Sequence, residues 1–246
     1  SGKVYDTTAP SAVVITKQSG PDGTFTITDA AMSKTQTTYN WKFTPTDSAN
    51  YEETTGTVTI NVIETVAPTI KITSGSNEWT ATPGSITFDI LSNAAVNFTI
   101  DYADEVNGSG IKDKQYFVSQ KALTATELES GTWLDYNGAF SVTSEGKYVV
   151  YARATDNDGN VTVISSNGIV IDTTAPEITG VEDGKTYDGD TIVAVEDALV
   201  GIKEVKLDGK AVTLTEGKFT IKGDNAKHTI TVTDNLGNTK DIEITV

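Results

Sequence analysis

Apolar and polar side chains alternate along most of the chain, so nearly every predicted element is a β-strand. Successive side chains of a strand point to opposite faces, and a period of two therefore places the apolar ones on one face. Tyr39, Trp41 and Phe43 share a face in this way. The alternation is clearest over residues 24–28, 39–43, 57–62, 85–90, 97–102, 147–155 and 229–233. A helix is expected only over residues 122–130, about two turns, which is marginal by itself.

A five-residue proline motif recurs where one group of strands ends and the next begins. The sequence Asp-Thr-Thr-Ala-Pro occupies residues 6–10 and 172–176, and the variant Glu-Thr-Val-Ala-Pro occupies residues 64–68. Proline has no amide hydrogen and holds the preceding residue extended, so strand pairing stops without coiling of the chain. Each copy is interpreted as a short, stiff joint. The joints predict three domains, at residues 1–65, 66–174 and 175–246.

The composition excludes several classes of partner. The 246 residues carry a net charge of −16, from 34 acidic and 18 basic side chains, which disfavours nucleic acid and anionic membranes. No apolar run approaches the roughly 20 residues of a membrane span, so membrane insertion is not expected. The chain has no cysteine, which suits bacterial exported domains better than secreted mammalian ones. No signal peptide precedes the first strand-like residues, and both ends are interpreted as cuts in a longer protein.

Catalytic chemistry has little support in the sequence. A nucleophilic triad needs a base beside the nucleophile. The only histidine, His228, lies on the same strand face as Ile230 and Val232 if the period of two holds, and it is interpreted as a rim or core residue. Acidic residues are abundant, but they cluster in turns rather than facing one another across a cleft as in a glycosidase. We therefore predict that the chain is not an enzyme, and we assign no catalytic, cofactor-binding or metal-binding residue and no cofactor.

Two stretches resemble bacterial repeats. In residues 39–62 a Trp-centred strand precedes a Pro-Thr-Asp-Ser-Ala-Asn-Tyr turn, and this arrangement is similar to a repeat common in bacterial surface proteins. Residues 64–246 resemble bacterial Ig-like repeats of surface and secreted proteins. Over residues 64–176 the motifs occur in the same order, and the third segment looks like a smaller domain of the same kind, because residues 234–238 repeat the Asp-to-Gly-Asn ending of residues 156–160. The motifs of residues 64–176 are Trp79, residues 109–111, Tyr116, Trp133, residues 146–148, 154–156 and 159–160, and the joint at 172–176.

The resemblance implies an all-β fold with three β-sandwich-type domains in tandem, the last two Ig-like, in an elongated arrangement. Tyr148 stands two residues before a small apolar position near the start of a strand, as does the tyrosine corner of Ig-like sandwiches. In the third segment, which is interpreted as seven short strands, Asp208-Gly209 predicts a tight hairpin turn.

Acidic residues near the joints leave two interpretations open. In an Ig-like sandwich the loops after the second and sixth strands lie at the pole where the chain enters, so their carboxylates are expected to converge there. The candidates are Glu64, Asp104, Glu105, Asp156 and Asp158 at one joint, and Asp172, Glu196, Asp197 and Asp234 at the other. Calcium takes about six to eight hard oxygen ligands of this kind. The alternative is plain turn chemistry, because residues 156–159 lack EF-hand spacing and Asp-Gly and Gly-Asn are ordinary turn formers.

Aromatic residues offer a second route to ligand binding. Trp133 and Tyr136, together with Tyr116, would stack on a sugar ring if they were exposed, since the faces of aromatic rings are apolar. Packing inside the fold is the alternative for these three, and it is the expectation for Trp41 and Trp79.

These observations favour a non-catalytic extracellular region of a bacterial cell-surface or secreted protein, acting as a stalk or presenting a binding face. The alternative is a carbohydrate-binding accessory region of a secreted polysaccharide-degrading enzyme. We expect a monomer, with a host protein, a cell-surface protein or a glycan as the partner.

Overall fold

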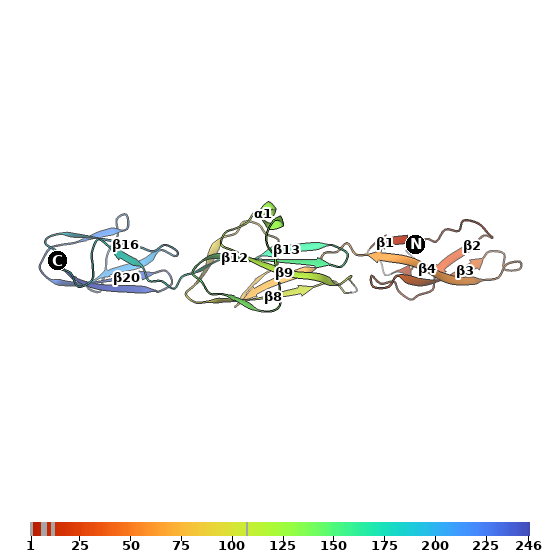
Figure 1. Ribbon diagram of the computed structural model, residues 1–246, viewed down its shortest axis with the longest axis horizontal. Coiled ribbons are helices and arrows are strands. Elements are labelled where there is room, and N and C mark those ends of the chain that lie inside the picture. Colours follow the sequence, from red (N-terminus) through yellow and green to blue (C-terminus); the bar gives the residue numbers. More distant parts are fainter. Residues whose placement is uncertain (1, 6–8, 11–12, 107) are drawn as a thin grey trace.

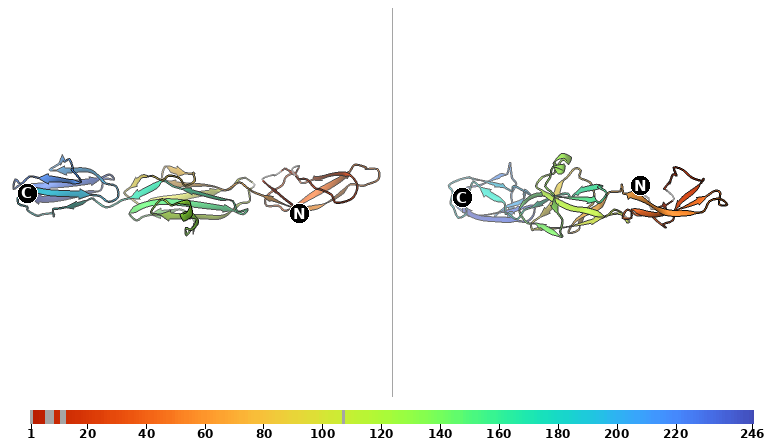
Figure 2. Two further views of the ribbon diagram at one scale, coloured as in Figure 1. Left: turned by 90° about the horizontal axis from the view of Figure 1, so that it is seen from above. Right: turned by 45° about the vertical axis from the view of Figure 1, so that its right-hand side comes forward.

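The computed structural model of the protein describes all residues except 1, 6–8, 11–12 and 107. Three β-rich units lie in a row, with the chain ends in the two outer units (Figure 1). The row keeps its elongated shape when it is turned about either axis (Figure 2). The first copy of the proline motif falls partly on residues 6–8, outside the described residues. In the part of the chain that the structure describes, no helix has the length and apolarity that crossing a bilayer requires.

The first unit contains one four-stranded sheet in the order β1-β4-β3-β2. Its strands are β1 (Gly2–Tyr5), β2 (Gly23–Ile27), β3 (Thr38–Pro45) and β4 (Thr54–Ile63). Tyr39 is fully buried with Met32 against β4, and the backbone oxygens of Ser33 and Gln36, both 2.8 Å from its hydroxyl, share the one O–H proton. Trp41 and Phe43 share its face, as predicted, and both pack against Phe25. This unit is therefore a small β domain with its own core.

The second unit packs two sheets face to face. One sheet has the order β10-β9-β12-β14-β7, with β13 also paired to β12, and the other has the order β11-β8-β5-β6. The strands are β5 (Thr69–Ser74), β6 (Asn77–Trp79), β7 (Phe88–Ser92), β8 (Val96–Ala103), β9 (Ile111–Ser119), β10 (Leu134–Asp135), β11 (Phe140–Val142), β12 (Gly146–Asp156), β13 (Val161–Ser165) and β14 (Gly168–Ile171). The helix of the described residues, α1 (Ala125–Glu129), is capped at its N-terminus by a capping box, in which the side chains of Thr124 and Glu127 each accept the other's backbone N–H.

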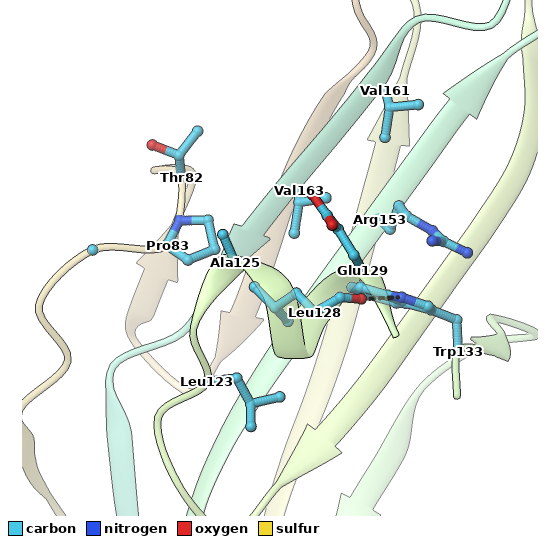
Figure 3. A pocket seen from close by; sticks show the side chains of 11 residues that line it. Thr82, Pro83, Leu123, Ala125, Leu128, Glu129, Trp133, Arg153, Val161 and Val163 are labelled. Carbon is cyan, nitrogen blue, oxygen red and sulfur yellow. Dashed lines mark hydrogen bonds between the residues drawn. The ribbon is translucent and has the colours of Figure 1, made fainter. Parts of the chain in front are cut away.

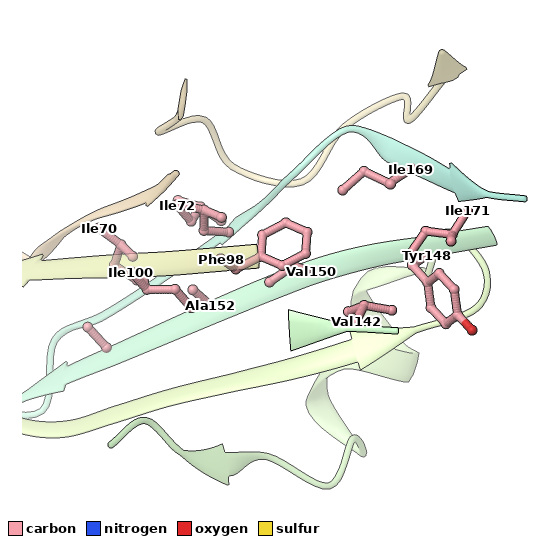
Figure 4. Packing of buried hydrophobic residues seen from close by; sticks show 12 residues of the cluster. Ile70, Ile72, Phe98, Ile100, Val142, Tyr148, Val150, Ala152, Ile169 and Ile171 are labelled. Atoms are coloured by element: carbon pink, nitrogen blue, oxygen red, sulfur yellow. The ribbon is translucent and has the colours of Figure 1, made fainter. Parts of the chain in front are cut away.

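Strand β12 is the centre of this sandwich. Tyr148, Val150, Ala152 and Ala154 face the second sheet and meet its isoleucines and Phe98 (Figure 4). The Tyr148 hydroxyl donates to the backbone oxygen of Glu145 at 3.0 Å, three residues upstream, which confirms the predicted tyrosine corner. The opposite face of β12 is also buried, a feature that simple alternation does not predict. There Val149 and Tyr151 pack with residues of the α1 segment, including Leu128 and Trp133.

The third unit has the seven strands that the sequence predicts. They are β15 (Glu177–Thr179), β16 (Thr191–Glu196), β17 (Ile202–Leu207), β18 (Lys210–Ala211), β19 (Lys218–Ile221), β20 (Lys227–Asp234) and β21 (Thr239–Thr245). They form two sheets, β15-β16-β19 and β18-β17-β20-β21, around a core that includes Val193, Ile230 and Val232. Asp208 and Gly209 turn the β17–β18 hairpin with φ angles of 52° and 76°, the positive values that a tight hairpin turn needs.

Each hydrophobic cluster of the described residues lies inside one unit, and so does each strand pairing. The prediction of an all-β chain with β-sandwich-type domains in tandem is confirmed, and the second and third units are Ig-like two-sheet sandwiches. The boundaries at 1–65, 66–174 and 175–246 stay a proposal that these clusters support.

Candidate functional site

The two joints between the units, at residues 64–68 (the first joint) and 172–176 (the second joint), each bring together three carboxylates. At the first joint, Glu64 directly follows β4, Asp104 follows β8 and Asp156 ends β12. At the second joint, residue 172 directly follows β14, residue 197 follows β16 and residue 234 ends β20. Within each group, one carboxylate oxygen of each residue lies within 4.8 Å of the others. The predicted convergence at one pole of each sandwich is therefore present in the structure.

The first cluster is built on a hydrogen-bonded turn. The Asp156 Oδ1 atom accepts the backbone N–H groups of Asp158 and Asn160, at 2.9 and 2.8 Å. The Asn160 side-chain amide donates both to Asp156 Oδ2 and to the backbone oxygen of Glu64, at 2.8 and 2.9 Å. Since Glu64 belongs to the linker, this amide fastens the linker to the second domain.

The second cluster repeats this turn. The Asp234 Oδ1 atom accepts the N–H groups of Leu236 and Asn238, at 2.8 and 2.9 Å. The Asn238 amide donates to Asp234 Oδ2 at 2.7 Å and to the backbone oxygen of Asp172 at 3.2 Å. The linker is thus fastened to the third domain in the same way.

The third acid of each cluster also occupies an equivalent place. Asp104 Oδ2 accepts the N–H of Gly110 at 2.6 Å, and Asp197 Oδ1 accepts the N–H of Gly201 at 2.8 Å. Both glycines have positive φ angles, 87° and 76°, which side-chain-bearing residues rarely adopt. The two joints therefore share one backbone design.

The joints differ in their counter-charge. At the first, the Lys34 ammonium lies 3.2 Å from Glu64 Oε1 and also forms an ion pair with Glu105. The Lys34 side chain is 5% exposed and that of Glu64 is 0% exposed. Burial alone would raise the pKa of Glu64, but the Ser109 N–H, at 2.6 Å, and the Lys34 ammonium together lower it. Lys34 comes from the first domain, so its pair with Glu64 holds the linker and its pair with Glu105 crosses the joint to the second domain.

The second joint has no such cation. Among the described residues, no Lys, Arg or His side chain forms an ion pair with Asp172, Asp197 or Asp234. Asp172 is 1% exposed; its Oδ1 accepts the Thr174 N–H at 3.1 Å, and its Oδ2 is buried without a hydrogen-bond partner. Burial raises the pKa of the Asp172 carboxyl, and the neighbouring charges of Asp197, Asp234 and Glu145 raise it further.

The three other predicted acids lie outside the two carboxylate clusters. Asp158 Oδ2 accepts the backbone N–H of Glu64 at 2.7 Å and so holds the linker rather than joining the carboxylate cluster. Glu105 pairs with Lys34. Glu196 is exposed at the end of β16, where it stands opposite Glu177 of β15.

Trp133 lines a pocket of about 450 Å³ between α1 and β13 (Figure 3). Its indole N–H donates to the backbone oxygen of Leu128 at 3.1 Å, and the Arg153 guanidinium lies 4.6 Å from its ring centre. Tyr136 lies elsewhere, packed against the inter-sheet core with its hydroxyl accepting the Ile100 N–H at 2.9 Å. Tyr116 packs against the same core. The structure therefore separates Trp133 from the two tyrosines that the sequence grouped with it.

His228 is a buried rim residue of the third domain, as the sequence suggested. Its Nδ1 lies 2.8 Å from Asp208 Oδ2 and its Nε2 lies 3.2 Å from Asp224 Oδ1. The hydrogen bond with Asp208 is the main cause that raises the pKa of His228. Both ring nitrogens are thus engaged by carboxylates, and among the described residues neither is hydrogen-bonded to a Ser or Thr hydroxyl.

Comparison with known proteins adds the following. No protein-family model matches the chain. No curated protein matches it either. Structural neighbours include fibronectin(III)-like modules of CbhA from Clostridium thermocellum, at 11% identity and a TM-score of 0.25, covering 71% of this chain and 93% of that one. The Bacteroides ovatus glucan-utilization protein SGBP-B, solved with a mixed-linkage heptasaccharide, shows 14% identity and a TM-score of 0.23, covering 91% and 59%.

An eight-Ig-domain fragment of Down Syndrome Cell Adhesion Molecule shows 13% identity and a TM-score of 0.40, covering 86% of this chain and 28% of that fragment. The chain thus spans well under two thirds of this neighbour's length, and slightly under two thirds of the SGBP-B chain. At such identities and TM-scores, these neighbours assign neither a ligand nor a role to the chain.

Three residues of the joints escape prediction from the sequence. Lys34 lies in a loop of the first domain, far in the chain from Glu64, and no local pattern marks it. Asn160 and Asn238 are ordinary turn residues by composition. The common spacing of Asp156 to Asn160 and Asp234 to Asn238 is the one signal that would have indicated their shared function.

Proposed function

We propose that the chain is a non-catalytic, extracellular spacer region of a bacterial cell-surface or secreted protein, which holds a neighbouring part of that protein at a distance. The observation that carries this proposal is the row of three units, each with a separate hydrophobic core (Figure 1). A row of small β units gives a chain of 246 residues more length than one compact body of the same size would have.

The joints support a spacer that resists bending. Besides the Asn160 and Asn238 bonds, the second linker is fastened to the second domain by Glu145. Its Oε1 atom accepts the Thr173 N–H at 2.7 Å and the hydroxyls of Thr173 and Thr174 at 2.5 and 2.7 Å. A linker bonded to the domains on both sides loses the freedom that a flexible tether would have.

The side chains support a role without catalysis. His228 is the only histidine, and its two nitrogens are held by Asp208 and Asp224. The chain has no cysteine, so thiolate chemistry is absent. Within the described residues, the carboxylates that converge do so at the joints, where they accept backbone N–H groups of the turns that they help to build.

A second candidate is a carbohydrate-binding accessory region of a secreted polysaccharide-degrading enzyme. The pocket beside Trp133 is the observation that favours it. Against it, Arg153 covers one face of the indole and Tyr136 lies on another side of the sheet, so a flat stacking platform for a sugar ring is missing. Tryptophan fluorescence that changes with a soluble glucan in the unaltered chain, but not in a Trp133→Phe variant, would favour this candidate over the spacer.

Small-angle X-ray scattering tests the spacer proposal. A compact chain of this length has a radius of gyration of about 18 Å. The proposal predicts a value well above that and a pair-distance distribution with a long tail, unchanged between low and high protein concentration as for a monomer. A radius of gyration near 18 Å would contradict the proposal. Antibody labelling of intact source cells, or detection in their medium, tests the extracellular location.

A further inference from the structure

We infer that the second joint is a calcium site, in which Asp172, Asp197 and Asp234 hold one ion that ties the linker to the third domain. The site lies within the proposed spacer and deepens its function, because the ion would stiffen this joint.

The first reason is uncompensated charge. Three carboxylates converge within 4.8 Å, and among the described residues no cationic side chain pairs with them. Asp172 and Asp234 are 1% and 0% exposed. Buried carboxylates without a counter-charge are costly. A bound divalent cation removes that cost.

The second reason is an oxygen atom that the protein leaves unused. Asp172 Oδ2 is buried and has no hydrogen-bond partner, although Oδ1 of the same carboxylate accepts the Thr174 N–H. Buried polar atoms without partners are rare in folded proteins. Asp197 and Asp234 likewise use Oδ1 to hold their own turns through several backbone N–H groups, so the turns are set independently of the ion.

The donor set selects calcium. All three side chains offer hard oxygen atoms, and there is no histidine or cysteine at the joint that would favour zinc or copper. A pocket of about 330 Å³ beside Asp172 and Asp197, lined also by Glu145, Glu177 and Glu196, has room for the waters that complete a coordination shell. Calcium accepts about six to eight oxygens in flexible geometry, whereas magnesium demands a near-ideal octahedron.

The first joint is the internal control. It has the same turn and three carboxylates in equivalent places, with Glu64 where the second joint has Asp172, but the Lys34 ammonium already lies against Glu64 and Glu105. A tethered ammonium there takes the place that a metal ion takes at the second joint. One ion per chain is therefore expected, not two.

Isothermal titration calorimetry with calcium chloride tests this inference on the full chain after treatment with chelator, in about 150 mM KCl to screen diffuse binding to the acidic surface. The expected result is one calcium per chain. The Asp197→Asn variant keeps the side-chain oxygen that accepts the loop N–H groups, and it should bind at least tenfold more weakly. The equivalent first-joint variant, Asp104→Asn, should retain one calcium with unchanged affinity.

Asp172→Asn provides a second variant if Asp197→Asn unfolds, with far-UV circular dichroism as the check. Absence of binding at millimolar calcium would overturn the inference, and so would binding that both second-joint variants leave intact. Equal binding of magnesium would overturn the assignment to calcium. Failure of the spacer proposal is seen separately, because scattering reports the elongated shape whether or not an ion binds.

Discussion

The two joints of this protein share one framework and differ in what balances their charge. In both, an aspartate at the end of a strand caps a turn, an asparagine bridges that aspartate to the linker backbone, and a third acid accepts a glycine N–H. At the first joint a lysine of the preceding domain balances the carboxylates. At the second joint no described side chain does so.

The difference shows in the acid–base behaviour of equivalent residues. The pKa of Glu64 lies below its ordinary value, because the Ser109 N–H and Lys34 outweigh the effect of burial. The pKa of Asp172 lies above its ordinary value, because burial and three neighbouring carboxylates act together. With the inferred calcium site, the same backbone design has its charge balanced by Lys34 at the first joint and by a soluble ion at the second.

Removing the Lys34 side chain should have the largest effect on stability. Lys34→Met leaves the buried Glu64 without its counter-charge, and breaking a buried ion pair costs about 3 kcal/mol. We expect the melting temperature of the second domain to fall without calcium and to recover when calcium is added. Calorimetry should then show a second bound calcium.

Lys42→Met is the matched control, because Lys42 forms an exposed pair with Glu53 in the same domain. Exposed pairs contribute about 0–1 kcal/mol, so little change is expected there. If Lys34→Met melts like the control and gains no calcium, then the lysine does not act as the counter-charge of the first joint.

The shared turns should respond alike when their bridging amides are removed. Asn160→Ala and Asn238→Ala each delete two hydrogen bonds and leave a buried linker carbonyl without its donor, a loss of about 1–3 kcal/mol. Chemical denaturation should show losses that agree within about 0.5 kcal/mol. The exposed Asn137→Ala serves as the control. A large loss at one joint alone would mean that the two turns are not equivalent.

The second and third domains differ at the tyrosine corner. Tyr148 lies eight residues before Asp156, and the residue eight before Asp234 is Ala226. Tyr148→Phe removes the bond to Glu145 and should destabilise the second domain by about 1 kcal/mol. Thermal denaturation followed by near-ultraviolet circular dichroism should register a drop of a few degrees. Tyr51→Phe, at an exposed tyrosine, should leave the melting temperature unchanged. Equal melting temperatures of the two variants would mean that the Tyr148–Glu145 hydrogen bond does not stabilise the second domain.

The smallest expected effect is a pH dependence confined to the third domain, which holds the only histidine. Its hydrogen bond with Asp208 raises the pKa of His228 above the ordinary value of 6.5. The stabilisation from protonated His228 is therefore complete below about pH 6.5 and is lost as the pH rises through the folded-state value. His228→Gln should flatten this decline. A third domain that gains stability over the same rise in pH would contradict the assigned direction.

Much of the fold could be predicted from the sequence, because local pattern and global structure agree. Alternation placed Tyr148, Val150 and Ala152 on one face, and Asp208-Gly209 marked its hairpin. Burial of the other face of β12 could not be predicted, since it depends on where the α1 segment packs.

The acids of the joints could be predicted because an Ig-like sandwich gathers particular loops at one pole. Lys34 could not be predicted, because its contact with Glu105 joins two domains and depends on their relative placement. The separation of Trp133 from Tyr136 also depends on packing, since one side chain turns toward Arg153 and the other toward the inter-sheet core.

Distance measurements across both joints test most directly the central claim that calcium stiffens the second joint and not the first. The chain has no cysteine, so spin labels can be placed one pair at a time at exposed strand positions, with Thr26→Cys and Thr99→Cys across the first joint and Thr99→Cys and Thr220→Cys across the second. Double electron–electron resonance should give a narrow distance distribution across the first joint with or without calcium. Across the second joint the distribution should narrow when calcium is added. A response to calcium at both joints, or at neither, would contradict the account.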